Sequence, residues 1–222
     1  MPLKKIANKF VIAAEYIAGE WRSIFQPSRY HIKRGYAHRK SVPHYDDTAL
    51  TDEYQKEVYE LARLYADKYN YTNILDIGCG SGYKLLQQFP DSNTIGAEVK
   101  PTYDFLVKTY PQRKWADIME PGSLPKQTDI IICADVIEHI IDPDQLINTI
   151  KAIDFKLLFI STPERILTTG KYHYGPAYNE CHVREWSAAE FHAYVSEHFN
   201  VLKHFITDIE NATQLLICEH KQ

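Results

Sequence analysis

Apolar residues along this chain fall into short continuous runs that alternate with segments in which they recur every three to four positions. Such runs are typical of strands covered on both faces, and the wider spacing is typical of amphipathic helices. The order predicts an α/β fold, a doubly wound, seven-stranded, mostly parallel sheet with one antiparallel strand near its end. The expected strands are 73–77, 94–99, 113–116, 129–134, 155–161, 201–207 and 212–218, and the expected helices are 51–69, 83–89, 101–110, 143–153 and 187–198.

Residues 1–50 precede this pattern and are expected to form a helical lid extension, with the α/β domain spanning residues 51–222. Apolar residues at helical spacing predict an amphipathic first helix, which is too polar and short to span a bilayer. A membrane-surface role for it stays open as an alternative. Residues 29–39 are rich in Arg, Tyr and His, and form either a solvated linker or a lid over a substrate cleft. The apolar positions are Ile6, Phe10, Ala13, Ala14 and Ile17.

Composition narrows the class of protein. Among 222 residues, 45% are hydrophobic and 24% charged, as expected for an ordinary globular domain. The formal charge of −4 gives the chain as a whole no attraction to nucleic acid, and DNA is not an expected partner. The four cysteines form no Cys-x-x-Cys pair, so a thiolate zinc site or a disulfide framework is not expected, and the cytoplasm is the expected compartment.

A glycine-rich turn follows the first expected strand. Gly78, Gly80 and Gly82 stand at alternate positions after Asp76, where they let the backbone turn sharply and approach a ligand. The next helix would direct its positive end at that ligand. The turn lacks the Lys-Ser/Thr of a nucleotide triphosphatase, and Tyr83 stands where a dinucleotide fingerprint has glycine, so both of those ligands are disfavoured.

Acidic residues follow four of the expected strands. Since parallel strands end at one edge of a sheet, Asp76, Glu98, Asp117 and Asp135 are expected to lie around one cleft. Glu98 stands about twenty residues beyond the glycine turn, a spacing suited to binding both hydroxyls of a ribose. Asp117 would accept a hydrogen bond from an exocyclic amine, with the amide of Ile118 donating to a ring nitrogen. Together these residues predict a nucleoside site.

Residues 74–82, Ile-Leu-Asp-Ile-Gly-Cys-Gly-Ser-Gly, resemble the first motif of class I S-adenosylmethionine-dependent methyltransferases, and the later acids match that family's motifs in order and spacing. The resemblance implies the Rossmann-like fold of these enzymes and S-adenosylmethionine as cofactor. The glycine turn would hold the methionine portion, Glu98 the ribose, Asp117 with Ile118 the adenine, and Asp135 would lie beside the sulfonium. The implied cofactor-binding set is Asp76, Gly78, Gly80, Gly82, Glu98, Asp117, Ile118 and Asp135.

Two segments are candidates for the methyl acceptor site. Residues 135–139 follow the fourth strand and residues 178–187 end a long loop, so His139 and His182 are expected to converge, with Glu138 orienting an imidazole or contacting the acceptor. A neutral histidine can take the proton of an attacking hydroxyl. Alternatively Asp135, Glu138, His139 and His182 bind a divalent ion, an arrangement that resembles the metal site of small-RNA 3′-end methyltransferases. A purely structural role for the same residues stays open.

A nearer resemblance is to bacterial methyltransferases of polysaccharide and natural-product clusters, carried by residues 39–59 and by residues 162–186. It implies O-methylation of a polar hydroxylated acceptor such as a sugar, glycan or capsule-related small molecule. The alternatives are a metal-assisted RNA 3′-end ribose 2′-O-methyltransferase, with RNA the less favoured partner, and a non-catalytic cofactor-binding subunit. The candidate acceptor contacts are Tyr45, Gln55, Tyr59 and Arg184.

Overall fold

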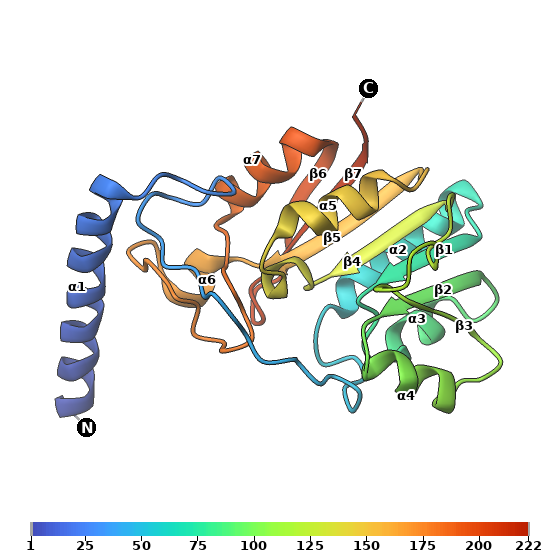
Figure 1. Cartoon of the computed structure of the whole chain (residues 1–222), viewed down its shortest axis with the longest axis horizontal. Coiled ribbons are helices and arrows are strands. Elements are labelled where there is room, and N and C mark those ends of the chain that lie inside the picture. Colours follow the sequence, from blue (N-terminus) through green and yellow to red (C-terminus); the bar gives the residue numbers. More distant parts are fainter. Residues whose placement is uncertain (1, 222) are drawn as a thin grey trace.

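The computed structural model describes residues 2–221, and the side chains of residues 13–221. A seven-stranded sheet runs through the molecule in the order β3-β2-β1-β4-β5-β7-β6 (Figure 1). All neighbours are parallel except β7, which is antiparallel to both β5 and β6. The predicted fold is confirmed. The strands are β1 Asn73–Ile77, β2 Asn93–Glu98, β3 Lys114–Asp117, β4 Ile130–Ala134, β5 Leu157–Pro163, β6 Phe199–Asp208 and β7 Thr213–His220.

Helices cover both faces of the sheet, as the crossovers between parallel strands require. Ile147 of α5 and Phe191 of α7 belong to the core on one face, and Val58 of α2 and Leu85 of α3 to the core on the other. Every residue of β4 is buried between these layers, which explains its uninterrupted apolar sequence. The helices are α1 Pro2–Phe25, α2 Lys56–Tyr69, α3 Tyr83–Gln88, α4 Thr102–Thr109, α5 Pro143–Lys151, α6 Arg165–Thr169 and α7 Ala188–His198, with a 3₁₀ turn, η1, at Ile137–His139.

Capping hydrogen bonds within a few residues determine where two of these helices, α5 and α7, begin. Asp142 accepts a hydrogen bond from the Asp144 amide at the start of α5, with Pro143 in the first turn. Ser187 and Glu190 form a capping box at the start of α7. Both helix starts agree with the sequence-based expectation.

The start of α2 differs from the prediction. The predicted helix begins at residue 51, whereas α2 begins at Lys56, directly after Gln55, which adopts a left-handed conformation with φ 58°. The Gln55 side chain instead donates a hydrogen bond to Asp135, 80 positions away (3.1 Å). A long-range contact therefore sets this boundary.

The segment between β5 and α7 is also more ordered than expected. It contains the short helix α6, and Glu164 pairs with Trp186 in an isolated bridge.

At the other end of the chain, α1 stands at the edge of the molecule, away from the sheet (Figure 1). Among the described residues, no helix combines the length and the apolar character needed to cross a membrane.

Candidate active site

A cavity of about 420 Å³ opens where β1, β2 and β4 end. We call it the strand-end cavity. Gly78 and Glu98 line it from the ends of β1 and β2, and Asp135 lines it after β4. Residues 39–55, which we call the strap, connect the N-terminal segment to α2 (Figure 1). They contribute Tyr45, Asp47 and Gln55 among others to the cavity wall. Two of the four predicted strand-end acids, Glu98 and Asp135, thus line one cavity together with the strap, whereas Asp76 and Asp117 do not line it.

The three glycines of the turn have different surroundings, although all have positive φ. A Cβ on Gly78, which lines the cavity, would lie 2.3 Å from Val136 Cγ2. On Gly80 it would lie 2.1 Å from Asp47 Oδ2, so this glycine makes room for the strap. Gly82 does not line the cavity and faces the ring of Trp115, which allows α3 to pack closely.

Carboxylates gather on one side of the strand-end cavity. Glu98 accepts hydrogen bonds from the amides of Gly80 (2.9 Å) and Val99 (3.0 Å), yet burial raises its pKa to about 7. Burial likewise raises the pKa of Asp76 to about 7; its Oδ2 accepts from the Tyr59 hydroxyl (2.9 Å), and its buried Oδ1 has no partner. A buried acid group of this kind favours a cationic or hydrogen-bond-donating ligand.

Asp47 joins these acids and was not predicted from the sequence. Burial raises its pKa as well. The acidic pair at 46–47 is unremarkable in a polar stretch of sequence, and only the path of the strap brings Asp47 against Gly80. Tyr59, predicted as an acceptor contact, lines the strand-end cavity and holds Asp76.

The residues predicted to hold an adenine ring are only partly arranged for it. Ile118 lines the strand-end cavity, but its amide donates to the Glu98 carbonyl (3.0 Å). The predicted hydrogen bond from this amide to a ring nitrogen is therefore wrong. Asp117 does not line the cavity; its Oδ1 accepts from the Met119 amide (3.0 Å). Ile118 therefore contributes an apolar wall.

A second cavity of about 350 Å³ adjoins the first, and we call it the loop cavity. Tyr45, Gln55 and Asp135 line both cavities and so form the boundary between them. Asp135 has a positive φ of 53° and accepts from Ser161 Oγ (2.6 Å) and from Gln55 (3.1 Å). The remaining wall comes from the strap, the end of β5, α6, the loop before α7 and the turn between β6 and β7, namely Tyr54, Pro163, Thr168, Thr169, Tyr178, Asn179, His182, Glu185 and Asn211.

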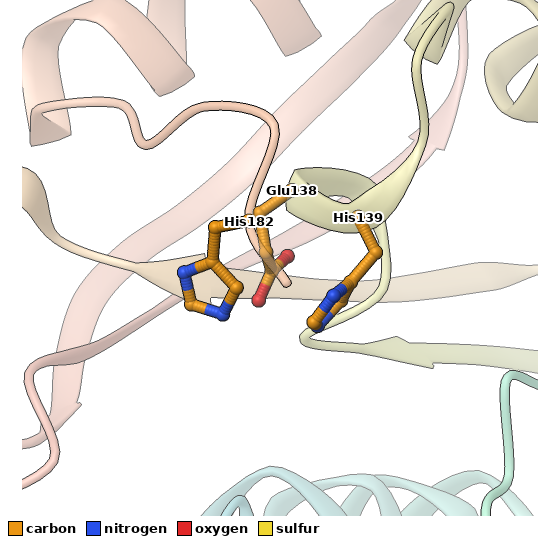
Figure 2. Close-up of side chains that lie close together, drawn as sticks. All are labelled: Glu138, His139 and His182. Atoms are coloured by element: carbon orange, nitrogen blue, oxygen red, sulfur yellow. The ribbon is translucent and has the colours of Figure 1, made fainter. Parts of the chain in front are cut away.

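Glu138, His139 and His182 converge beside this boundary, and we call them the imidazole cluster (Figure 2). One ligand atom from each lies within 4.8 Å of the others. His139 lines the strand-end cavity, and His182 lines the loop cavity. The two rings lie edge to face, with centroids 4.8 Å apart. The predicted convergence of Glu138, His139 and His182 is therefore present, whereas Asp135 is not part of the cluster.

Hydrogen bonds fix the orientation of both imidazoles. His139 Nδ1 lies 2.9 Å from the Cys181 carbonyl, and His182 Nδ1 lies 2.8 Å from Glu185 Oε1. Since both partners are acceptors, Nδ1 carries the proton and Nε2 keeps its lone pair in each neutral ring. Asn179 Nδ2 donates to His182 Nε2 (3.0 Å). Glu185 was not predicted as a site residue, although its position three residues after His182 is a usable signal.

Burial controls the charge of the imidazole cluster. It lowers the pKa of His139 to about 4, with the neighbouring His182 acting in the same direction. It raises the pKa of Glu138 well above its ordinary value, and the nearby Asp135 adds to this effect. Glu138 Oε2 accepts from Thr162 Oγ1 (3.0 Å), whereas its buried Oε1 has no partner.

Arg184 is not where the predicted acceptor contact requires it. The side chain is buried, and its guanidinium donates to the carbonyls of Ile140 (2.7 Å) and Ile141 (2.6 Å), outside both cavities. It ties down the chain after η1. Arg39 has a similar role, since its Nη1 donates to the carbonyls of Ala177, Asn179 and His182.

The described geometry agrees with what known proteins share with this chain. The sequence profile of a family described as a methyltransferase domain matches residues 44–204. A comparison with curated proteins finds no match.

Solved structures with the same fold include an S-adenosylmethionine-dependent methyltransferase from Clostridium acetobutylicum ATCC 824 (TM-score 0.58, 15% identity, 75% of this chain and 92% of that chain). Another is the magnesium protoporphyrin IX methyltransferase of Synechocystis PCC 6803 with bound S-adenosylmethionine (TM-score 0.54, 11% identity, 75% of this chain and 79% of that chain). A third is the Pnkp1/Rnl/Hen1 RNA repair complex (TM-score 0.53, 16% identity). That match covers 73% of this chain and 41% of the matched chain of the complex. The chain belongs to the methyltransferase-domain family, and its fold is that of solved S-adenosylmethionine-dependent methyltransferases.

Proposed function

We propose that this enzyme methylates an oxygen atom of an uncharged, hydroxylated acceptor such as a sugar or a glycan unit. The observation that carries the proposal is the boundary formed by Tyr45, Gln55 and Asp135 between the two cavities, with one histidine of the imidazole cluster on each side. An acceptor in the loop cavity would then meet a cofactor in the strand-end cavity at this boundary.

The strand-end cavity suits S-adenosylmethionine, which supplies an electrophilic methyl group on a sulfonium. Asp47 in the cavity wall complements a positively charged ligand, and the amide-bound carboxylate of Glu98 has lone pairs left for ribose hydroxyls. Gly78 allows close approach of the backbone. Most of the rate enhancement would come from holding the two reactants in line. Residues 1–50 would serve as the lid extension of the domain formed by residues 51–222.

In this proposal His182 is the general base. Glu185 holds its Nδ1 proton, so Nε2 is available once the acceptor hydroxyl takes the place of the Asn179 amide. The low pKa of His139 makes that residue a weak base at neutral pH. His139, stacked on Tyr45 at a centroid distance of 5.6 Å, would orient the acceptor instead.

The lining of the loop cavity favours a neutral acceptor. Tyrosine rings, hydroxyls and amides form most of it, and the lining residues, all in the described part of the chain, include neither lysine nor arginine. The arginines of the surrounding loop are bonded to protein groups, as described for Arg39 and Arg184. RNA is the less favoured acceptor because binding of its backbone depends on cationic side chains. The four free cysteines, three of them buried, agree with a location in the cytoplasm.

A divalent metal ion is the second candidate for activating the acceptor, and the imidazole cluster motivates it. Glu138, His139 and His182 offer one oxygen and two nitrogen ligand atoms, and the orphaned Glu138 Oε1 is a buried acceptor that a cation would satisfy. The bonds from Nδ1 to Cys181 and Glu185 are the kind that orient metal-binding histidines. Asp135 would not be a ligand, since it lies outside the group of mutually close ligand atoms that Glu138, His139 and His182 form.

The test is release of S-adenosylhomocysteine with neutral sugars, phosphorylated sugars and RNA 3′ ends as acceptors, before and after dialysis against a chelator. Turnover with neutral sugars that survives the chelator supports the base mechanism. Turnover that is lost and then restored by Mn²⁺ or Mg²⁺ supports the metal. Turnover with RNA alone would refute the proposed acceptor class. Cofactor binding without turnover on any acceptor would favour the non-catalytic subunit.

A further inference from the structure

Helix α1 packs on the rest of the molecule through its small and polar residues. A Cβ added to Gly19 would lie 2.1 Å from Tyr174 Cγ, so the helix meets this ring through a side chain that is only a hydrogen. Arg22 Nε donates to the Gly35 carbonyl (2.9 Å), and Glu20 accepts a hydrogen bond from the Tyr174 hydroxyl. The face that an amphipathic helix normally exposes is here the face in contact with the protein.

The apolar face of α1 points away from the protein. Ile17, Trp21, Ile24 and Phe25 are 58%, 66%, 62% and 77% exposed, and their spacing of i, i+4, i+7 and i+8 places them on one side of the helix. The sequence continues this spacing toward the N-terminus with apolar residues. Figure 1 shows α1 at the edge of the molecule with no other element on its outer side. A continuous apolar stripe of this kind marks an interaction surface.

Charge identifies the partner. Residues 1–40 contain nine lysines and arginines and two glutamates, a formal charge of +7, while the whole chain carries −4 and the remaining residues therefore −11. Arg34 lies at the end of the stripe, where its guanidinium donates to the carbonyls of Ile24 and Gln26 (both 3.5 Å). Two such segments would repel each other in a symmetric dimer, whereas an anionic surface attracts them.

We propose that α1 binds the surface of an anionic lipid bilayer, with its apolar stripe inserted at the headgroup boundary and the enzyme held on its polar side. The helix lies on the membrane and does not cross it, since no described helix is apolar enough to span one. An apolar stripe next to lysines and arginines is the pattern of interfacial helices. This inference does not depend on the acceptor, because neither cavity contains a residue of α1.

The test is co-sedimentation of the full chain with phosphatidylcholine vesicles and with vesicles that also contain phosphatidylglycerol. Binding is expected with the anionic vesicles, and at least tenfold less at high salt. Tryptophan emission should shift to the blue on binding. Trp186 is buried and Trp115 half-buried, so the shift reports on Trp21.

Ile24→Glu should weaken vesicle binding at least tenfold. Ile209→Glu is the matched control, because Ile209 is 77% exposed in the turn between β6 and β7, and it should bind as the unmodified chain does. Absence of binding by the unmodified chain would overturn the proposal. So would a dimer in light scattering that Ile24→Glu converts to a monomer, since the stripe would then face a second copy.

Discussion

The two cavities of this methyltransferase are built from different parts of the chain. The strand-end cavity takes Gly78, Glu98 and Asp135 from the ends of β1, β2 and β4, whose positions are fixed by strand pairing in the sheet. The loop cavity takes its groups from the strap and from the loop before α7, which are held by side-chain contacts to backbone carbonyls. In the proposed function, the cofactor site therefore lies on the sheet and the acceptor site lies on loops.

Substitution of His182 is expected to have the largest effect and to distinguish the role of the loop cavity in turnover from the role of the strand-end cavity in cofactor binding. His182→Ala should lower turnover by about 10²–10⁴-fold, the range for loss of a general base, while leaving cofactor affinity unchanged. Release of S-adenosylhomocysteine and calorimetric binding measure the two effects. His192→Ala, an exposed histidine on α7, is the control and should behave as the unmodified enzyme. An equal loss of cofactor affinity would assign His182 to the strand-end cavity instead.

Substitution of Glu98 should lower cofactor affinity and leave turnover at saturating cofactor largely unchanged. Glu98→Ala removes a carboxylate that accepts two amide hydrogen bonds and lines the strand-end cavity, so the affinity for S-adenosylmethionine should fall about ten- to a hundredfold. Turnover at saturating cofactor should be largely retained. Calorimetry with Glu120→Ala, an exposed acid after β3, provides the control. An unchanged dissociation constant would remove Glu98 from the cofactor site.

The strand-end cavity should also respond to pH. The pKa values of Asp76 and Glu98 are raised to about 7 in the free protein, so protonation below pH 7 removes the charge that a cationic cofactor needs. Cofactor affinity should therefore fall about tenfold between pH 8 and pH 6. Each of these two carboxyl groups binds more protons in the folded protein than in the unfolded chain over this interval, so their contribution to the melting temperature should rise as pH falls from 8 toward 5. Asp76→Asn should reduce both trends, and pH-independent binding would contradict the assignment.

The smallest expected effect is in the loop cavity. Tyr178 lines it with a largely exposed ring, and Tyr178→Ala should raise the KM for a sugar acceptor about three- to fivefold, the effect of losing one aromatic contact. Cofactor affinity should not change. Tyr178→Phe keeps the ring and should retain the original KM; if it does not, the hydroxyl and not the ring contacts the acceptor.

The sequence predicted most of the fold because its signals are local. Strand periodicity, the capping residues Asp142 and Ser187, and the glycine turn act within a few positions. The start of α2 was missed because Gln55 is fixed by a residue 80 positions away. That α1 is amphipathic was predictable, whereas the outward direction of its apolar face was not, since it depends on the contact between Gly19 and Tyr174.

The candidate site was predictable to a similar degree. Strand-end positions identified Glu98 and Asp135 as cavity residues, and motif spacing brought His139 and His182 together. Arg184 could not be assigned, because its residue type suits both an anion contact and the buried bonds that it makes to backbone carbonyls. Asp47 was missed because its neighbour Gly80 is distant in sequence.

Arg39 has a consequence for the order of events in a catalytic cycle. Its amide donates to the Val183 carbonyl, and its Nη1 to three carbonyls between residues 177 and 182, so the strap that closes over the strand-end cavity is fastened to the loop that carries His182. An opening of the strap that displaces Arg39 would therefore also displace the loop that carries His182 and open the acceptor cavity. For such an opening, kinetics should be sequential, with S-adenosylmethionine binding before the acceptor and S-adenosylhomocysteine leaving last.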